Sequence, residues 1–543
     1  MIFNAISKRT FAAATLVSLF LLAYYLSNPF LFQRIVNIET LPNKAVFVIV
    51  HVMAMLCMLA AAFASKKIFY AVAIVSYLSV FLDNCFFLVK HYAITLSDLS
   101  VLFISVGNTL DAVSQFRDDL IRAIATASVL LLSLLLLRRL VRERRYASHV
   151  VLTLCGLSFC FYLIIAVFKG EPSLVALPSN NTLPFGGSVL SLDSMIQRLK
   201  TPKRFVATKR NVPLVQPPKH IILIIDESVE AEKFRDLNKQ AFANAVDLGF
   251  ALSGANCSAA SNLILRAGPD SLALSKTILA TPTLFQLAKQ ANFKTVFFDL
   301  QGVLSDTAVR DYFSNQELAA VDQVYSRTEF GGETFERDIR FAQHFSNLLS
   351  KEDKVFAIVN KSGSHFPYAS NLPPDLAHTT DSYAASVSFS TIAFLHEIDS
   401  TLPDSTIVFY TSDHGQNFLA KSPHCNGASD STLSEWRVPL MLFLSKDLAA
   451  IRESINPSWN NRASHFELTE TIRVLFGYEA MFNKSLFDPP GNVPSQPYKA
   501  YFGPIKGLLG RPASFREFDR DTLGYPALDG SLTLPPSKGN TTP

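Results

Sequence analysis

Side chains that can bind a metal or attack phosphorus gather at a few points in the second half of this 543-residue chain. They are Asp226-Glu227, the hydroxyl-rich run Gly254–Asn262, the turn Ser362-Gly-Ser-His-Phe-Pro367, the motif Thr411-Ser-Asp-His-Gly415 and, beyond it, His424. Each of these alone is typical of an ordinary turn or loop. Together they combine carboxylate, imidazole and hydroxyl groups, which suit a tetrahedral zinc site. Zinc lowers the pKa of a coordinated serine and polarises a phosphoryl oxygen, and further histidines can hold a charged substrate or protonate a leaving group.

Short apolar runs predict the elements that position these groups. The runs are Ile221–Ile225, Thr295–Phe298, Val355–Val359, Thr406–Tyr410 and Pro439–Leu444, with helical patterns such as Thr283–Gln290 and Tyr383–Leu402 between them. Their alternation predicts an α/β/α sandwich with a mostly parallel sheet and helices on both faces. Because ligands bind at the carboxyl ends of strands in such sheets, we expect the polar motifs to lie together at that edge.

The chain before this domain indicates a membrane segment. Apolar stretches lie at Phe11–Leu26, Ala45–Ser65, Ile68–Val89, Ala123–Leu137 and His149–Phe168. A helix needs about 20 apolar residues to cross the hydrocarbon core, and the shortest stretch is flanked by arginines that can reach the interface. The first stretch lacks a clear small-residue cleavage site, so we interpret it as a retained anchor rather than a signal peptide. Residues 1–168 are therefore predicted to form a domain of five transmembrane helices.

Basic clusters predict the orientation of these helices. The clusters Lys8-Arg9, Lys66-Lys67 and Arg138–Arg145 all fall on one side if the N-terminus is cytoplasmic. An odd number of spans then places the C-terminal domain outside, which in a bacterium is the periplasmic face of the inner membrane. We expect Leu99–Leu110 to form an interfacial helix, and we interpret Asp83, inside the third span, as a structural residue.

Composition limits the remaining possibilities. Hydrophobic residues make up 49% of the chain, charged residues 17%, and the net charge is only +4. The basic clusters therefore indicate membrane topology rather than nucleic-acid binding. Residues 169–218, where Pro, Ser, Asn and Gly are frequent, are expected to form a linker with a short amphipathic helix at Val189–Lys200. Residues 219–487 are the predicted soluble domain, and residues 488–543 an irregular tail rich in Pro and Gly.

With these motifs in place, the chain resembles the inner-membrane phosphoethanolamine transferases of the alkaline phosphatase/sulfatase superfamily, which modify lipid A and lipopolysaccharide core sugars. The resemblance extends from the membrane spans to about residue 478. Ile225-Asp-Glu-Ser228 matches the strand that carries Gly-Glu-Thr in the family, and Ser412-Asp-His-Gly415 matches its Ser-Asp-His-Gly. The zinc ligands that this resemblance implies are Glu227, Asp413 and His414.

The resemblance also implies residues that bind the substrate. Gly363-Ser-His365 matches the family's Gly-Ser-His-Gly-Pro, so His365 is expected to contact the substrate phosphate. His424 stands close to the position of the family's second substrate-side histidine. Ser464-His465 matches a Ser-His pair near the end of the domain, which we interpret as structural.

The nucleophile is expected four residues after a cysteine, where the family has threonine. Counting from Cys257 gives Ser261, which we take as nucleophile and fourth zinc ligand, with Ser258 as the alternative. The Cys/Ser-x-Pro-x-Arg pattern of formylglycine sulfatases is absent after Cys257. Gln416 and Asn360 stand where the family has a glutamate and a histidine, which indicates a divergent member.

Two cysteines of the soluble part flank the expected site. Of the six cysteines in the chain, only Cys257 and Cys425 lie there. They would form a disulfide in an oxidising periplasm, or remain free thiols that pack as small hydrophobic side chains. In neither case can they form the several disulfides common in lipid A-modifying members.

These implications predict a zinc-dependent transferase that works in two steps. Ser261 would attack phosphatidylethanolamine, release diacylglycerol and carry phosphoethanolamine until a sugar hydroxyl of an envelope glycolipid, lipid A or lipopolysaccharide core, displaces it. We expect Zn²⁺ as cofactor, a membrane-bound monomer and no nucleic-acid partner. The alternatives are a phosphoglycerol transferase that uses phosphatidylglycerol, a membrane-anchored phosphodiesterase or sulfatase-like hydrolase, and an inactive relative that serves as a binding module.

Overall fold

The computed structural model divides into two compact units, residues 1–201 with 508–511 and residues 202–507 with 512–543. It describes residues 17–28, 41–90, 116–169, 177–199, 205–210, 217–304, 313–349, 353–419, 423–427, 431–490, 498–502 and 514–518, together with a few single residues between 15 and 113.

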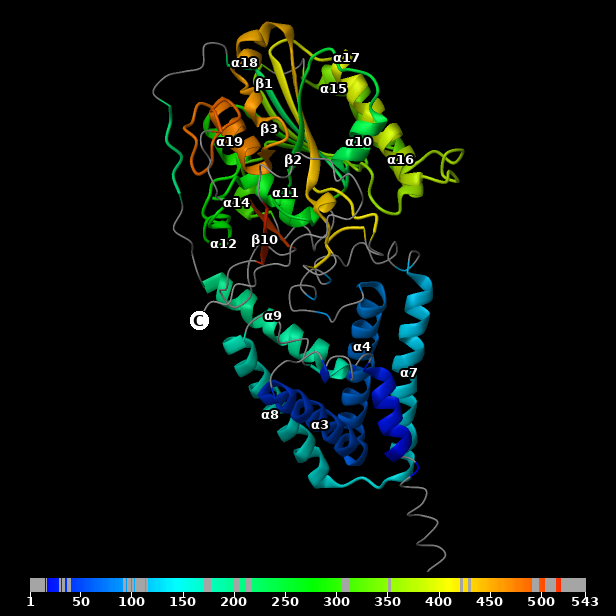
Figure 1. The fold of residues 1–543 in the computed structure, drawn as a ribbon. Helices are drawn as coiled ribbons and strands as arrows, with labels where there is room; N and C mark the ends of the chain where they lie inside the picture. The colour runs from blue at the N-terminus through cyan, green and yellow to red at the C-terminus, as the bar shows by residue number, and fades with distance from the viewer. Residues whose placement is uncertain are drawn as a thin grey trace, which may run out of the picture. The chain divides into compact units, whose positions relative to one another are not determined.

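Four helices of the first unit are long and apolar enough to cross a membrane (Figure 1). They are α3 (Leu41–Phe63), α4 (Lys66–Lys90), α7 (Arg117–Leu140) and α8 (Arg145–Lys169). They confirm the second to fifth predicted spans. The first predicted span, Phe11–Leu26, overlaps a shorter apolar helix, Val17–Ser27. The beginning of this predicted span lies outside the described residues. The count of five spans therefore stays a prediction, as does the interfacial helix at Leu99–Leu110, most of which also lies outside the described residues.

Two of the basic segments lie side by side at one end of this unit. The Arg138 guanidinium donates to the carbonyl oxygens of Ala62 (2.8 Å) and Ala64 (2.7 Å), and the Arg144 N–H donates to that of Phe63 (2.7 Å). These bonds join the end of α7 and the loop after it to the end of α3, so the two basic segments lie at the same end of the unit, as the charge bias predicts. Because α8 starts at this end, it leads the chain to the opposite end of the helical unit (Figure 1).

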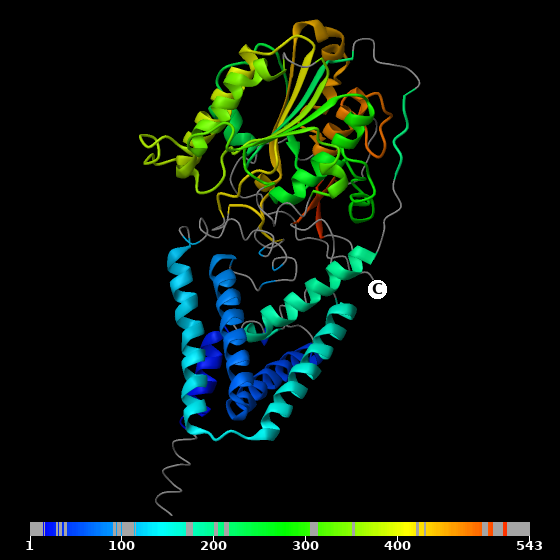
Figure 2. The same ribbon diagram turned by 180° about the vertical axis from the view of Figure 1, so that it is seen from behind.

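Part of the predicted linker is helical. The helix expected at Val189–Lys200 is present but begins earlier, because α9 spans Thr182–Leu199 and follows a short turn at Ser179–Asn181. It runs obliquely to α4 (Figure 2). Ser179 Oγ donates to the buried carboxylate of Asp83 at 2.5 Å. This contact supports the structural interpretation of Asp83.

An eight-stranded mixed sheet forms the centre of the second unit, with strand order β4-β3-β5-β1-β6-β7-β2-β8. Its strands are β1 (His220–Asp226), β2 (Ala245–Leu252), β3 (Lys294–Asp299), β4 (Gln323–Ser326), β5 (Val355–Asn360), β6 (Thr406–Ser412), β7 (Arg437–Leu444) and β8 (Ala463–Ser464). The first five in spatial order are parallel, β7 is antiparallel to β6 and β2, and β8 is parallel to β2. The predicted, mostly parallel sheet is thus confirmed.

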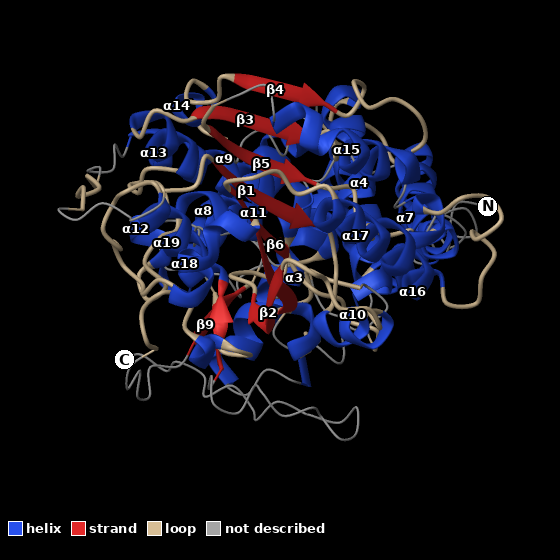
Figure 3. Cartoon of the chain, turned by 90° about the horizontal axis from the view of Figure 1, so that it is seen from above, coloured by secondary structure: helices blue, strands red, loops and turns tan. Residues whose placement is uncertain are grey.

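Helices cover both faces of the sheet (Figure 3). They are α10 (Ala231–Leu237), α11 (Ser258–Ala267), α12 (Leu274–Thr277), α13 (Leu284–Gln290), α14 (Asn315–Leu318), α15 (Thr334–Leu349), α16 (Ser382–Ser386), α17 (Ala393–Ser400), α18 (Ala449–Ser454) and α19 (His465–Leu475). Alternate residues of β1 serve the two cores. Leu223 packs in the core lined by α13, α18 and α19, and Ile222 in the core lined by α10, α15 and α17. A strand buried on both faces must be apolar throughout, which explains the run Ile221–Ile225.

The expectation of an irregular tail does not hold for two segments beyond residue 488. β9 (Tyr498–Tyr501) and β10 (Phe515–Phe518) form a two-stranded antiparallel sheet. The N–H of Tyr501 donates to the carbonyl of Gly254 at 3.0 Å, and its carbonyl accepts from the N–H of Asn256 at 3.2 Å. β9 is therefore bonded to the loop that leads into α11.

Tyr498 tests how much this late strand stabilises the domain. Its buried ring packs in a cluster with Trp436, and its hydroxyl bonds the carbonyls of Leu252 (3.1 Å) and Ser253 (2.9 Å). Removing a buried aromatic ring costs about 3–5 kcal/mol, whereas removing one hydroxyl costs about 1 kcal/mol. We expect Tyr498→Ala to lower the free energy of unfolding by the larger amount and Tyr498→Phe by the smaller. The only two tryptophans of the chain lie in this unit, so tryptophan fluorescence during denaturation of the full-length protein reports on it alone. Equal midpoints for all three proteins would contradict the prediction.

Candidate active site

Three of the predicted ligands come together at the carboxyl ends of neighbouring strands. Glu227 follows β1 and Asp413-His414 follows β6, and the register of the two strands pairs Asp226 with Ser412. The N–H of Asp413 donates to the carbonyl of Asp226 at 2.9 Å, which continues this pairing. One ligand atom from each of the three buried side chains lies within 4.8 Å of the others. The predicted grouping of Glu227, Asp413 and His414 is present.

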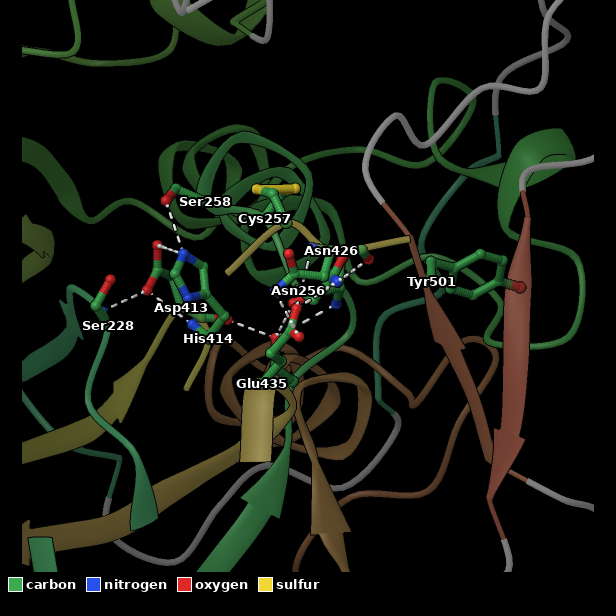
Figure 4. The surroundings of a disulfide bond; sticks show 12 residues. Ser228, Asn256, Cys257, Ser258, Asp413, His414, Asn426, Glu435 and Tyr501 are labelled. Atoms are coloured by element: carbon green, nitrogen blue, oxygen red, sulfur yellow. Dashed lines mark hydrogen bonds and ion pairs between the residues drawn. A yellow bond between two sulfur atoms is a disulfide. The ribbon is translucent and has the colours of Figure 1, made fainter. Parts of the chain in front are cut away.

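A serine hydroxyl completes this group, and it belongs to Ser258. The Ser258 Oγ lies 3.0 Å from His414 Nε2 (Figure 4). It also lies 3.3 Å from Glu227 Oε1. Ser258 is the first residue of α11, whose N-cap is Cys257. The positive end of a helix dipole favours developing negative charge at such a position. The Ser258 hydroxyl thus lies beside buried acidic and imidazole groups, which are the groups that can activate a hydroxyl.

Ser261, the nucleophile that the cysteine count predicts, faces a different environment. Its fully buried hydroxyl lies 2.5 Å from the carbonyl oxygen of Asp413, 3.1 Å from His465 Nδ1 and 3.0 Å from Ser253 Oγ. Burial lowers the pKa of His465 to about 3, so this histidine is neutral and suits the structural role assigned to it. The described contacts make Ser261 a support for the Asp413 backbone, whereas Ser258, the alternative in the sequence analysis, lies at the cluster.

The spacing of the ligand atoms fits a tetrahedral zinc ion. Zinc bonds of about 2.0–2.1 Å at tetrahedral angles put ligand atoms about 3.3 Å apart. His414 Nε2 lies 3.6 Å from both Glu227 Oε1 and Asp413 Oδ2, and Ser258 Oγ lies 3.0 Å and 3.3 Å from its two neighbours. Among the described residues, the buried Asp413 Oδ2 has no hydrogen-bond partner. A buried carboxylate oxygen without a hydrogen-bond donor lowers the stability of the fold, and a bound cation would compensate for the missing donor.

The proton positions and pKa shifts of His414 and Asp413 also fit a site that binds a cation. His414 Nδ1 lies 2.8 Å from the carbonyl oxygen of Gly415, which can only accept, so Nδ1 carries a proton and Nε2 faces the carboxylates. Burial lowers the pKa of His414, but Asp413 and Glu227 outweigh it and the net shift is upward. Burial and the charge of Glu227 raise the pKa of Asp413 to about 7. The site therefore favours positive charge between its two carboxylates.

A glycine lets the predicted Gly-Ser-His turn approach the cluster. A Cβ atom on Gly363 would lie 2.2 Å from Asp226 Oδ1 and 2.7 Å from the backbone nitrogen of Glu227, and the residue has a φ of 54°. The N–H of Ser364 donates to the carbonyl of Glu227 at 3.0 Å. The turn that bears His365 is thus bonded directly to the strand end that bears Glu227.

The cysteine pair holds the second predicted histidine near the site. Cys257 and Cys425 form a disulfide (Figure 4), so the alternative of two free thiols is wrong. Cys425 follows His424, whose ring centroid lies 4.5 Å from that of His414. The bond therefore links the N-cap of α11 to the loop that carries His424.

Sequence reasoning overlooked Gln301. Its Nε2 donates to Glu227 Oε2 at 2.9 Å. Gln301 stands two residues beyond the end of β3, at the same edge of the sheet as the other motifs, so the strand-end rule would have found it.

Comparisons with known proteins agree with this architecture. Residues 254–478 match the family model described as sulfatase, and no curated protein matches the chain. Among solved structures, the integral membrane protein lipooligosaccharide phosphoethanolamine transferase A (EptA) from Neisseria meningitidis has a TM-score of 0.56 at 14% identity, over 85% of this chain and 95% of that one. The C-terminal periplasmic domain of EptC from Escherichia coli, in complex with zinc, has a TM-score of 0.46 at 16% identity, over 59% and 98%. The lipoteichoic acid synthase LtaP from Listeria monocytogenes has a TM-score of 0.35 at 13% identity, over 62% and 93%. The likeness to EptA shows a shared fold, with apolar helices followed by a mostly parallel α/β domain.

Metal loading should stabilise the domain through Asp413. A ligand that binds only the folded state at a thousandfold excess over its Kd adds about 4 kcal/mol to the free energy of unfolding. We expect zinc to raise the denaturation midpoint of the chelator-treated protein, and Asp413→Asn to abolish most of this rise. Asp404→Asn makes the same chemical change at an exposed position and should respond to zinc like the wild type. An equal zinc response of all three proteins would rule out the proposed ligand set.

Proposed function

Because a sulfatase-family domain here follows apolar helices in the fold shared with EptA, we propose that the protein is a membrane-bound transferase of phosphoethanolamine. It takes the group from phosphatidylethanolamine and passes it to a sugar hydroxyl of an envelope glycolipid, lipid A or lipopolysaccharide core. The observation that carries this proposal is the Ser258 hydroxyl, 3.0 Å from His414 Nε2 at the start of α11. The apolar helices support a donor that is itself a lipid.

The cluster supplies the residues for a zinc site. Glu227, Ser258, Asp413 and His414 would hold the ion. Bound zinc supplies a Lewis acid that lowers the pKa of the serine hydroxyl and offsets the charge of the phosphodiester. In this proposal Ser258 is the nucleophile and fourth zinc ligand, the roles that the count from Cys257 predicted for Ser261.

The reaction proceeds in two displacements at phosphorus. The Ser258 hydroxyl gives its proton to Glu227 Oε1, which lies 3.3 Å from Oγ. The Oγ then forms a bond to phosphorus, the bond from phosphorus to the glycerol oxygen breaks, and diacylglycerol leaves as an alcohol after it gains a proton. His424, whose ring lies beside that of His414, is the proposed donor of this proton, and His365 is the proposed contact of the phosphate. In the second displacement a sugar hydroxyl gives its proton to His424 and attacks the same phosphorus. The bond from phosphorus to Ser258 Oγ breaks, and Oγ regains the proton held at Glu227.

The proposed location is the bacterial inner membrane, with the catalytic domain in the periplasm. The two basic loops joined by Arg138 lie at one end of the helical unit, and the positive-inside rule assigns that end to the cytoplasm. Since α8 leads away from it, the chain emerges on the other side. A disulfide between Cys257 and Cys425 agrees with that oxidising compartment.

The covalent intermediate provides the decisive test. Purified, zinc-loaded, full-length protein is incubated with phosphatidylethanolamine without an acceptor, and peptides are mapped by mass spectrometry. We expect phosphoethanolamine on Ser258 and no adduct in Ser258→Ala. Ser261→Ala removes only a support of the Asp413 backbone, worth about 1 kcal/mol, and should keep the adduct at Ser258.

Three other outcomes would change the assignment. An adduct on Ser261 would restore the nucleophile predicted from the cysteine count. A phosphoglycerol adduct that forms only with phosphatidylglycerol would retain the site and change the donor. Release of free headgroup by water, with no transfer when a sugar acceptor is added, would identify a hydrolase.

A further inference from the structure

The two oxygens of Glu227 have different surroundings. Oε1 faces the cluster, at 3.3 Å from Ser258 Oγ and 3.6 Å from His414 Nε2, and it also accepts from Ser228 Oγ at 2.7 Å. Oε2 accepts from Gln301 Nε2 at 2.9 Å. A carboxylate whose second oxygen is engaged by a donor presents one oxygen to a metal.

The side-chain amide of Gln301 is fixed at both of its ends. Nε2 donates to the carbonyl oxygen of Lys361 at 2.7 Å as well as to Glu227, and Oε1 accepts from Asn360 Nδ2 at 2.9 Å. Both neighbours of Nε2 are acceptors, so the amide group cannot be reversed without placing its oxygen against two other oxygens. The hydrogen bonds therefore run in one direction, with Asn360 donating to Gln301 and Gln301 donating to Glu227.

The backbone that carries Gln301 is equally constrained. The register of β3 and β5 pairs Asp299 with Asn360. The Asp299 carboxylate accepts from the N–H groups of Gly302 (2.9 Å), Val303 (2.7 Å) and Leu304 (2.8 Å). These bonds hold the turn after β3, so Gln301 is presented to Glu227 by a rigid scaffold rather than by a free loop.

We propose that Gln301 is a positioning residue that makes Glu227 a one-oxygen metal ligand, and that Asn360 locks Gln301 in the donating orientation. The inference rests on the metal site of the proposed function. It assigns a use to Asn360, which stands where the resemblance expects a histidine. Partners that orient a metal ligand typically change metal affinity or activity about 10- to 100-fold when they are removed.

Zinc affinity measured by chelator competition tests this directly, without any enzymatic substrate. The proteins are the full-length wild type, Gln301→Met, Asn360→Leu and the double variant, with Gln290→Met as a matched control at an exposed position of α13. We expect Gln301→Met to weaken zinc binding roughly 10- to 100-fold and Asn360→Leu to weaken it less. The double variant should bind no more weakly than Gln301→Met, because Asn360 acts through Gln301. Gln290→Met should equal the wild type.

The stability of the zinc-free proteins separates positioning from general damage. If Gln301 positions a ligand, the chelator-treated Gln301→Met and control proteins unfold at similar midpoints while their zinc affinities differ. Unchanged affinity in Gln301→Met, or additive losses in the double variant, would overturn the inference and leave the metal site in place. A wild type that does not bind zinc would instead overturn the metal site itself.

Discussion

Two carboxylates buried side by side are the constraint around which this site is built. Glu227 and Asp413 follow adjacent strands, and burial together with the charge of Glu227 raises the pKa of Asp413 to about 7. Like charges at this distance in a water-poor interior are tolerated only when donors or cations surround them. Neighbouring groups supply part of these donors, since the backbone N–H groups of Ser228 and His414 donate to Asp413 Oδ1 at 3.0 Å and 2.7 Å. Of the four oxygens of these two carboxylates, only Asp413 Oδ2 has no hydrogen-bond donor among the described residues, which makes it the expected contact of a bound cation.

Asp226, the residue next to Glu227, has the opposite role. Successive residues of a strand point to opposite sides, so Asp226 turns away from the cluster and pairs with the buried Lys361 at 2.9 Å. Its carboxylate also accepts from Thr391 at 2.8 Å and Tyr410 at 3.0 Å. A buried pair of this kind requires its hydrogen-bond partners to be in place. In the Asp-Glu dipeptide, a structural anchor, Asp226, is therefore followed directly by a proposed metal ligand, Glu227.

Strand ends could be predicted from the sequence, but the choice between nearby hydroxyls could not. Apolar runs located β1 and β6, and with them Glu227, Asp413 and His414, because burial on both faces leaves a clear local signal. Ser258 and Ser261 are three residues apart on one helix, which separates them by about 4.5 Å along its axis. Only the start of α11 determines which of them reaches the cluster.

The sequence did not predict β9, because the burial of this strand depends on partners such as Gly254 that lie far away in the sequence.

β9 gives the site a dependence on the far end of the chain. Its Tyr501 is bonded to Gly254 and Asn256, only a few residues before Ser258, although almost the whole domain separates them in sequence. A ribosome synthesises Ser258 early and the strand that braces the preceding loop late. The proposed transferase thus acquires the full support of the loop that leads to Ser258 only once nearly all of the polypeptide has been made and folded. Fragments that lack their last residues, whether from interrupted synthesis or proteolytic trimming, would carry every ligand of the site and still lack the brace.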